Sequence, residues 1–227
     1  MHWVAVAITS SLLVALVLFV VYSMLSTGRK QHLRFIHIPK TAGTTLEDLA
    51  MQHGIRWGRN ETKTLLCKLT RTNAPSCNPW HRPPRKTQTP TFAVIRDPYE
   101  RCVSEYKYQN PNGTAQKLNQ WVKSNLQNAR KNPYMTDCHF LPQAQYVYDE
   151  KQRKVIPHLL RFSHLETDFN KLMEQYGLPM RLHAGTKRGR ESAAKPTAAD
   201  LNDESRKLIE SFYVDDFQLI RHIQVAD

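Results

Sequence analysis

The sequence predicts an α/β domain in which helices flank a central parallel sheet, preceded by one transmembrane helix. Three observations lead to this prediction. Residues 3–25 form a run without a charged side chain, long enough to cross a hydrocarbon layer of roughly 30 Å. Two strand-like segments, residues 33–38 and 91–95, each lead through a polar loop into a helical pattern. Such strand–loop–helix alternation is typical of a parallel sheet covered by helices.

The apolar run near the start of the chain predicts a retained membrane anchor. It exceeds the apolar core of roughly 7–15 residues found in cleaved signal peptides, and no Lys or Arg precedes it. The predicted organisation is a short tail at residues 1–2, a signal anchor at 3–25, a short stem at 26–32 and the folded domain at 33–227.

The orientation of this anchor remains open from the residues alone. Arg29, Lys30 and Arg34 follow the run, and the positive-inside rule would therefore place the domain in the cytosol. Glycosylation sequons at Asn60 and Asn112, together with an even number of cysteines, favour a lumenal domain instead.

Charge and composition narrow the class of protein. The chain has 32 Lys and Arg against 20 Asp and Glu, a formal net charge of +12, and the first 28 residues carry none of it. A hydrophobic content of 41% excludes a disordered chain, and four cysteines are too few for a small disulfide scaffold. The basic domain predicts a polyanionic partner. Nucleic acid is disfavoured, because a membrane anchor and scattered charges do not make a recognition helix.

The first polar loop has the character of a phosphate site. A strand over residues 33–38 leads into it, and a helix over residues 46–52 follows and ends near Gly54. Backbone N–H groups at a helix start bind phosphate well. A Walker A loop is excluded, since its Lys directly follows the last Gly, whereas Lys40 precedes Gly43 by three residues. The loop comprises Pro39, Lys40, Thr41, Ala42, Gly43, Thr44 and Thr45.

A second phosphate-binding element follows the strand at residues 91–95. Arg96 stands at the end of this strand, and Asp97 and Pro98 are suited to the N-cap and first position of a helix. The guanidinium of Arg96 and the hydroxyl of Ser104, two turns along that helix, suit phosphate oxygens.

The remaining elements are predicted from periodicity and turn residues. A third strand is expected over residues 159–162, followed by a helix over 166–176 that ends at Gly177. The Pro-rich stretch 55–90 and the basic stretch 183–197 are expected to be loops, the first of them functional because of its length. One final amphipathic helix would place on one face Leu201, Leu208, Ile209, Phe212 and Ile220.

At this point the chain resembles a known family. Residues 37–45 are similar to the 5′-phosphosulfate loop of the membrane-bound carbohydrate sulfotransferases, and residues 95–104 to their 3′-phosphate motif. The likeness is closest to the heparan-sulfate-type branch and extends more loosely over residues 33–227. It implies a P-loop-like sulfotransferase fold. It also implies transfer of a sulfuryl group from 3′-phosphoadenosine 5′-phosphosulfate (PAPS) to a glycan hydroxyl, without a metal.

The resemblance also implies roles for particular residues. Lys40 would stabilise the leaving phosphate oxygen, with the loop from Pro39 to Thr45 as the cradle for the donor. Arg96 and Ser104 would grip the 3′-phosphate. The basic loop that closes over the nucleotide would contain Lys187, Arg188 and Gly189.

A histidine is expected as the general base, because its unperturbed pKa lies near neutrality. His81, in the Pro-rich stretch between the two motifs, is the first choice, and the neighbouring Trp80 offers a face for stacking on a sugar. His139 is the second choice for the base, or else it contacts the acceptor together with Gln143. Glu47 is a third candidate.

The resemblance also implies a place in the cell. Membrane-bound members are type II Golgi proteins with lumenal domains, and the charge fits an acidic glycan acceptor. The alternatives are a membrane-anchored module that binds polyanions or glycans without catalysis, a sulfotransferase for protein tyrosine, and a nucleotide kinase. The kinase is disfavoured by the placement of Lys40. A structural zinc site is disfavoured because the sequence has no Cys-x-x-Cys pair.

Overall fold

The computed structural model describes residues 33–62, 65, 68, 70, 76–86, 89–183, 185 and 196–225. They belong to one compact unit, Leu33–Asp227. The predicted tail, anchor and stem, residues 1–32, lie outside the described residues. Within the described segments, no helix combines the length and the apolar character needed to cross a membrane.

A small parallel sheet forms the centre of the unit. Its strands are β1 (Arg34–Phe35), β2 (Thr91–Ile95) and β3 (His158–Arg161), in the order β1-β2-β3. The predicted α/β architecture with a parallel sheet is therefore confirmed. The first strand is shorter than expected because the chain turns away from β2 after Ile36, whose N–H still donates to the carbonyl of Phe92 at 2.8 Å.

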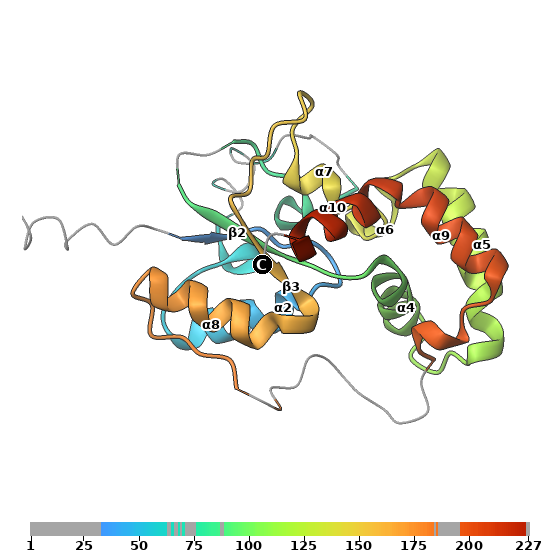
Figure 1. Cartoon of the computed structure of the whole chain (residues 1–227), viewed down its shortest axis with the longest axis horizontal. Helices are drawn as coiled ribbons and strands as arrows, with labels where there is room; N and C mark the ends of the chain where they lie inside the picture. Colours follow the sequence, from blue (N-terminus) through green and yellow to red (C-terminus); the bar gives the residue numbers. More distant parts are fainter. Residues whose placement is uncertain are drawn as a thin grey trace, which may run out of the picture. The chain divides into compact units, whose positions relative to one another are not determined.

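Helices flank this sheet (Figure 1). The α-helices are α2 (Gly43–Gln52), α4 (Pro98–Gln109), α5 (Ala115–Lys131), α7 (Ala144–Val147), α8 (Leu165–Gln175), α9 (Asp203–Phe212) and α10 (Val214–Val225). The short element α6 (Met135–Cys138) has a non-helical backbone at Thr136 and Asp137. Short 3-10 turns are η1 (Gly58–Asn60), η2 (Pro79–His81), η3 (Phe162–His164) and η4 (Ala198–Asp200).

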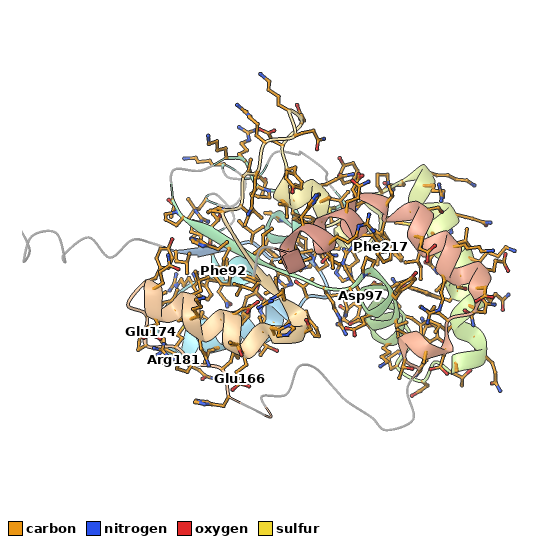
Figure 2. The ribbon with its side chains drawn as sticks, in the orientation of Figure 1. Phe92, Asp97, Glu166, Glu174, Arg181 and Phe217 are labelled. Carbon is orange, nitrogen blue, oxygen red and sulfur yellow. A yellow bond between two sulfur atoms is a disulfide. The ribbon has the colours of Figure 1, made fainter. Side chains whose placement is uncertain are left out.

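The buried strand β2 divides the core into two layers. Phe92 and Val94 pack into one cluster with residues of α2 and α8, whereas Ala93 and Ile95 pack into another with residues of α7 and α10. This alternation follows from the two-residue period of a strand. Figure 1 shows α2 and α8 on one side of the strands and α7 and α10 on the other, and Figure 2 marks Phe92 between them.

The helices α4, α5 and α9 enclose a third cluster. Helix α5, which the sequence analysis did not predict, turns one apolar face inward through Leu118, Val122 and Leu126, all of them buried. Helix α4 begins as predicted: the carboxylate of Asp97 accepts hydrogen bonds from the N–H groups of Tyr99 at 2.9 Å and Glu100 at 3.1 Å. Figure 2 marks Asp97 at this helix start.

The single final helix expected from the sequence is wrong. The chain forms two helices, α9 and α10, separated at Tyr213, which has a non-helical backbone (φ −110°, ψ 34°). The Tyr213 ring is buried and its hydroxyl donates to the carbonyl of Phe140 at 3.1 Å. Beyond the break, the buried carboxylate of Asp216 accepts hydrogen bonds from the N–H groups of Gln143 and Ala144. Tertiary contacts therefore fix the break.

Candidate active site

A cleft of about 990 Å³ lies where the chain leaves the three strands. Pro39, Arg96 and Phe162, which follow β1, β2 and β3, all line it. In parallel sheets this edge is the usual place for a ligand. Twelve of the residues predicted for the site line the cleft, namely Pro39, Lys40, Ala42, Gly43, Thr44, Thr45, Glu47, Trp80, His81, Arg96, Ser104 and His139.

The first loop exposes the amino end of α2 to the cleft. Lys40 (φ 69°) and Ala42 (φ 71°) adopt left-handed backbone conformations that direct the chain into the helix. Such conformations are costly for residues other than glycine and concentrate at functional sites. No described side chain caps α2, and its first turn has no acidic residue. The helix start is therefore suited to bind an anion.

Gly43 is required at this helix start by a close contact. A Cβ at this position would lie 2.1 Å from Nε2 of His37. The His37 ring is itself held from the other side, because its Nδ1 lies 2.7 Å from Oε1 of the buried Glu47. Any larger residue would displace the ring or the loop.

Lys40 lies over the ring of Tyr108, with Nζ 4.0 Å from the ring centroid. Burial lowers the pKa of Lys40 to about 8, an effect that Glu105 opposes and that Arg96 and Arg101 strengthen. The amine is therefore only partly protonated in weakly alkaline solution. An anion in the cleft would favour the charged form.

Arg96 is held in place on several sides. Its guanidinium stacks on Phe162 at 4.0 Å and donates through Nη1 to the carbonyl of Lys40 at 3.2 Å. Its backbone N–H donates to Gln143 at 3.0 Å, and its carbonyl accepts from the Gln143 amide at 2.8 Å. Burial lowers the pKa of Arg96 although Glu100 lies beside it. A buried cation facing a cleft is a strong site for a phosphate.

Arg101 ties the two sides of the cleft together. Its buried guanidinium donates to the carbonyls of Pro39 at 3.0 Å, His139 at 2.9 Å and Leu141 at 2.9 Å. A longer ion pair of 3.9 Å joins it to Asp216. One side chain thus fixes the loop that precedes α2 against the segment that carries His139.

Three histidines form a row along the cleft, and each is paired with a carboxylate. The ring centroids of His37 and His81 are 4.7 Å apart, and those of His81 and His139 are 5.2 Å apart. A carboxylate only accepts, so the Nδ1 nitrogens donate. The Nδ1–carboxylate pairs are His37 with Glu47 (2.7 Å), His81 with Asp137 (2.8 Å) and His139 with Glu105 (2.8 Å).

The pair of His81 and Asp137 has the properties of a general base and its orienting group. Burial lowers the pKa of His81, outweighing the hydrogen bond to Asp137 that acts to raise it. Burial acts to raise the pKa of Asp137, but hydrogen bonds from His81 and Asn78 lower it to about 2. Near neutral pH the pair is thus a neutral imidazole beside an ionised carboxylate, which can accept a proton from a hydroxyl.

A strained turn and a disulfide present Asp137 to His81. Thr136, Asp137 and Cys138 have positive φ values of 52°, 58° and 65°. Cys138 is joined by a disulfide to Cys77, in the segment that carries His81. Asn78, next to Cys77, donates to Asp137 from its backbone N–H at 2.5 Å and its side-chain amide at 2.6 Å. The disulfide therefore joins the segments that bear the two members of the pair.

Other predicted residues lie away from the cleft or outside the described chain. Thr41 is buried and its hydroxyl donates to the carbonyl of Ile38 at 2.8 Å. Gln143 is also buried and supports Arg96 from behind, outside the lining of the cleft. The loop with Lys187, Arg188 and Gly189 lies outside the described residues.

The predicted glycosylation sites differ in exposure. Asn112 is exposed in the turn between α4 and α5. Asn60 is only partly exposed, and its side-chain amide lies 3.5 Å from the carbonyl of Glu47. Asn112 is therefore the more accessible of the two acceptors.

Sequence reasoning missed several residues of the site. Arg101, Glu105 and Tyr108 lie on the helix of Ser104 at intervals of four and three residues, and this helical spacing was a signal that all three share one face. Asp137 carried no such signal, because its partner His81 is 56 residues away.

Together these features define a class of protein. A parallel sheet that presents a helix start, buried cations and a histidine–carboxylate pair in one cleft is suited to transfer a group from an anionic donor. A model of the family described as "Sulfotransferase family" matches residues 24–220, and the chain belongs to this family. It is therefore a transferase that moves a sulfuryl group, and the resemblance to sulfotransferases is confirmed at this level. Comparisons with curated proteins and with solved structures found no match.

Proposed function

We propose that the chain transfers a sulfuryl group from PAPS to a hydroxyl of a glycan, with His81 as the general base. The observation that carries the proposal is the convergence of two kinds of residue on one cleft. Lys40, Arg96 and the start of α2 are suited to the anionic donor, and the pair of His81 and Asp137 is suited to the acceptor.

The donor would lie along the two phosphate-binding elements. The N–H groups of Gly43, Thr44 and Thr45 would bind the 5′-phosphosulfate, because the start of α2 carries partial positive charge. Arg96 and Ser104, which both line the cleft, would bind the 3′-phosphate. Together these residues would bind both phosphate groups of the donor, at the 3′ and 5′ positions of its ribose.

The reaction would be an in-line displacement at sulfur. A bond forms between the acceptor oxygen and sulfur while the bond from sulfur to the phosphate oxygen breaks. The acceptor's proton passes to Nε2 of His81, and Asp137 stabilises the resulting imidazolium through Nδ1. Protonated Lys40 stabilises the negative charge on the leaving phosphate oxygen.

The surroundings of the cleft support a glycan as the acceptor. Trp80 lies beside His81, with ring centroids 5.8 Å apart, and offers an aromatic face to a sugar. Arg181 lines the same cleft and would favour an acidic glycan such as those of the heparan-sulfate type. The disulfide between Cys77 and Cys138 fits an oxidising compartment, which supports a type II Golgi protein with a lumenal domain.

The test is transfer of labelled sulfate from PAPS by the full-length chain to a panel of defined glycans, with a tyrosine peptide as the competing acceptor. Replacing a positioned base should lower turnover by about 10²–10⁴-fold in His81→Ala. His164→Ala is the matched control, since His164 lies outside the cleft lining and bonds to Ser163.

Two further outcomes separate the alternatives. His81→Ala should keep its affinity for 3′,5′-bisphosphoadenosine, whereas Arg96→Ala should lose it. Near wild-type turnover in a folded His81→Ala protein would refute the base. Donor binding without transfer to any acceptor would favour a binding module, and transfer to the peptide alone would reassign the acceptor.

A further inference from the structure

His81, Asp137 and His139 form a compact set of metal-binding groups in the cleft. Each offers one ligand atom, and the three atoms lie within 4.8 Å of one another. His81 is buried, the other two are partly exposed, and all three line the cleft. A solute that enters the cleft therefore reaches a cluster of nitrogen and oxygen donors, in which a cation would replace the hydrogen bond between His81 and Asp137.

The donor types suit a particular class of cation. Two imidazoles and one carboxylate are the ligands of many zinc sites, and imidazole also suits copper and nickel. This arrangement is distinct from the cysteine-based zinc site that the sequence disfavours. The remaining coordination position would face the cleft, as it does in zinc sites that keep a water or an added ligand.

The support behind His139 also favours metal binding. Nδ1 of His139 donates to Glu105 at 2.8 Å, and Glu105 is buried and receives a second hydrogen bond from Gln109 at 2.7 Å. This carboxylate fixes the ring and leaves Nε2 of His139 as the ligand. Histidines that bind metals usually have a partner of this kind.

We propose that His81, Asp137 and His139 bind a divalent cation of the zinc class, and that the bound cation inhibits the enzyme. The cation occupies His81, which would accept the proton of the acceptor hydroxyl, and Asp137, which orients it. It leaves the start of α2, Lys40 and Arg96 untouched. Inhibition is therefore directed against the acceptor and not against the donor. The inhibitory part rests on the proposed function, whereas the binding part stands on the side-chain cluster alone.

The binding part is tested by titrating the full-length chain, without an affinity tag, with ZnCl₂ in a calorimeter. The expected result is one Zn²⁺ per chain, reversed by EDTA. Glu105→Gln should weaken the affinity by about 10–100-fold, the usual effect of losing a carboxylate behind a ligand histidine. His139→Asn should weaken it further, and the control His164→Asn should leave it unchanged.

Two more measurements distinguish a loss of Zn²⁺ binding from a loss of folding, and test the inhibition of the enzyme. Each variant must bind 3′,5′-bisphosphoadenosine and retain its thermal unfolding midpoint, so that a loss of Zn²⁺ binding is not a loss of fold. Zn²⁺ should raise the KM for the acceptor without raising that for PAPS. Absence of stoichiometric binding, or equal affinity in His139→Asn and His164→Asn, overturns the site. If no acceptor is sulfated, the titration still decides the site, and only the proposed function fails.

Discussion

The disulfide between Cys77 and Cys138 should contribute more to the free energy of unfolding than any other single contact between the described segments. Its two cysteines are 61 residues apart, so the double variant Cys77→Ala/Cys138→Ala releases a large loop in the unfolded chain. The chain-entropy relation for a loop of this size gives a loss of about 4 kcal/mol in the free energy of unfolding at 25 °C. Both sulfurs are buried, and alanine leaves no unpaired polar group in their place.

The same change should reduce activity beyond its effect on folding. Cys77 precedes Asn78, which holds the carboxylate of Asp137, and Cys138 follows Asp137 directly. Without the disulfide, the strained turn at residues 136–138 can relax and move Asp137 away from His81.

Equilibrium unfolding in guanidinium chloride measures the stability, and sulfate transfer at a temperature where the variant is folded measures the activity. The wild-type chain treated with a thiol reductant is the control and should behave like the variant. A loss below about 1 kcal/mol would contradict the loop argument. Unchanged turnover in the folded variant would refute the link between the disulfide and the base.

Three further predictions concern the donor loop and the surface. The buried Lys40 amine loses its proton as the pH rises through its pKa of about 8, so kcat/KM for PAPS should fall over the same range. In Lys40→Arg this fall should disappear, because the guanidinium stays protonated. A fall that persists would exclude Lys40 as its source. Gly43→Ala places a Cβ 2.1 Å from Nε2 of His37 and should lower kcat/KM by about 10²-fold through displacement of the loop. Steady-state kinetics would contradict this if the value stayed within twofold. In a host that glycosylates secreted proteins, Asn112→Gln should abolish a glycosidase-sensitive shift in gel mobility. Asn60→Gln should retain the shift, since the Asn60 side chain already contacts the carbonyl of Glu47. Absence of any shift in the wild-type chain would count against a lumenal domain.

Local sequence patterns predicted much of the fold. The apolar run at residues 91–95, the cap at Asp97 and the glycine at 177 correctly predicted a buried strand, a helix start and a helix end. The break between α9 and α10 was missed because nothing in its local pattern departs from a helix. It depends on contacts of Tyr213 and Asp216 with residues about 70 positions earlier in the chain.

In the candidate site too, residues in continuous motifs could be predicted, whereas residues placed by distant contacts could not. The loop at residues 39–45, Arg96 and Ser104 could be expected to lie near one cleft, because each belongs to a continuous motif that follows a strand. Asp137 was missed, since its position depends on a distant disulfide and on a left-handed turn formed by non-glycine residues. Gln143 was assigned to the acceptor, but its buried amide brackets the backbone of Arg96, a contact that only the folded chain reveals.

The link from α10 to Arg96 has a consequence for the order of biosynthesis. Asp216 holds Gln143, and Gln143 holds the backbone of Arg96. Arg96, the residue proposed to bind the 3′-phosphate, is therefore secured by a helix that is translated after it and after all three strands. A nascent chain can form β1, β2 and the loop before α2 while Arg96 is still unsupported. We expect a product that stops before residue 214 to keep its sheet and yet fail to retain nucleotide.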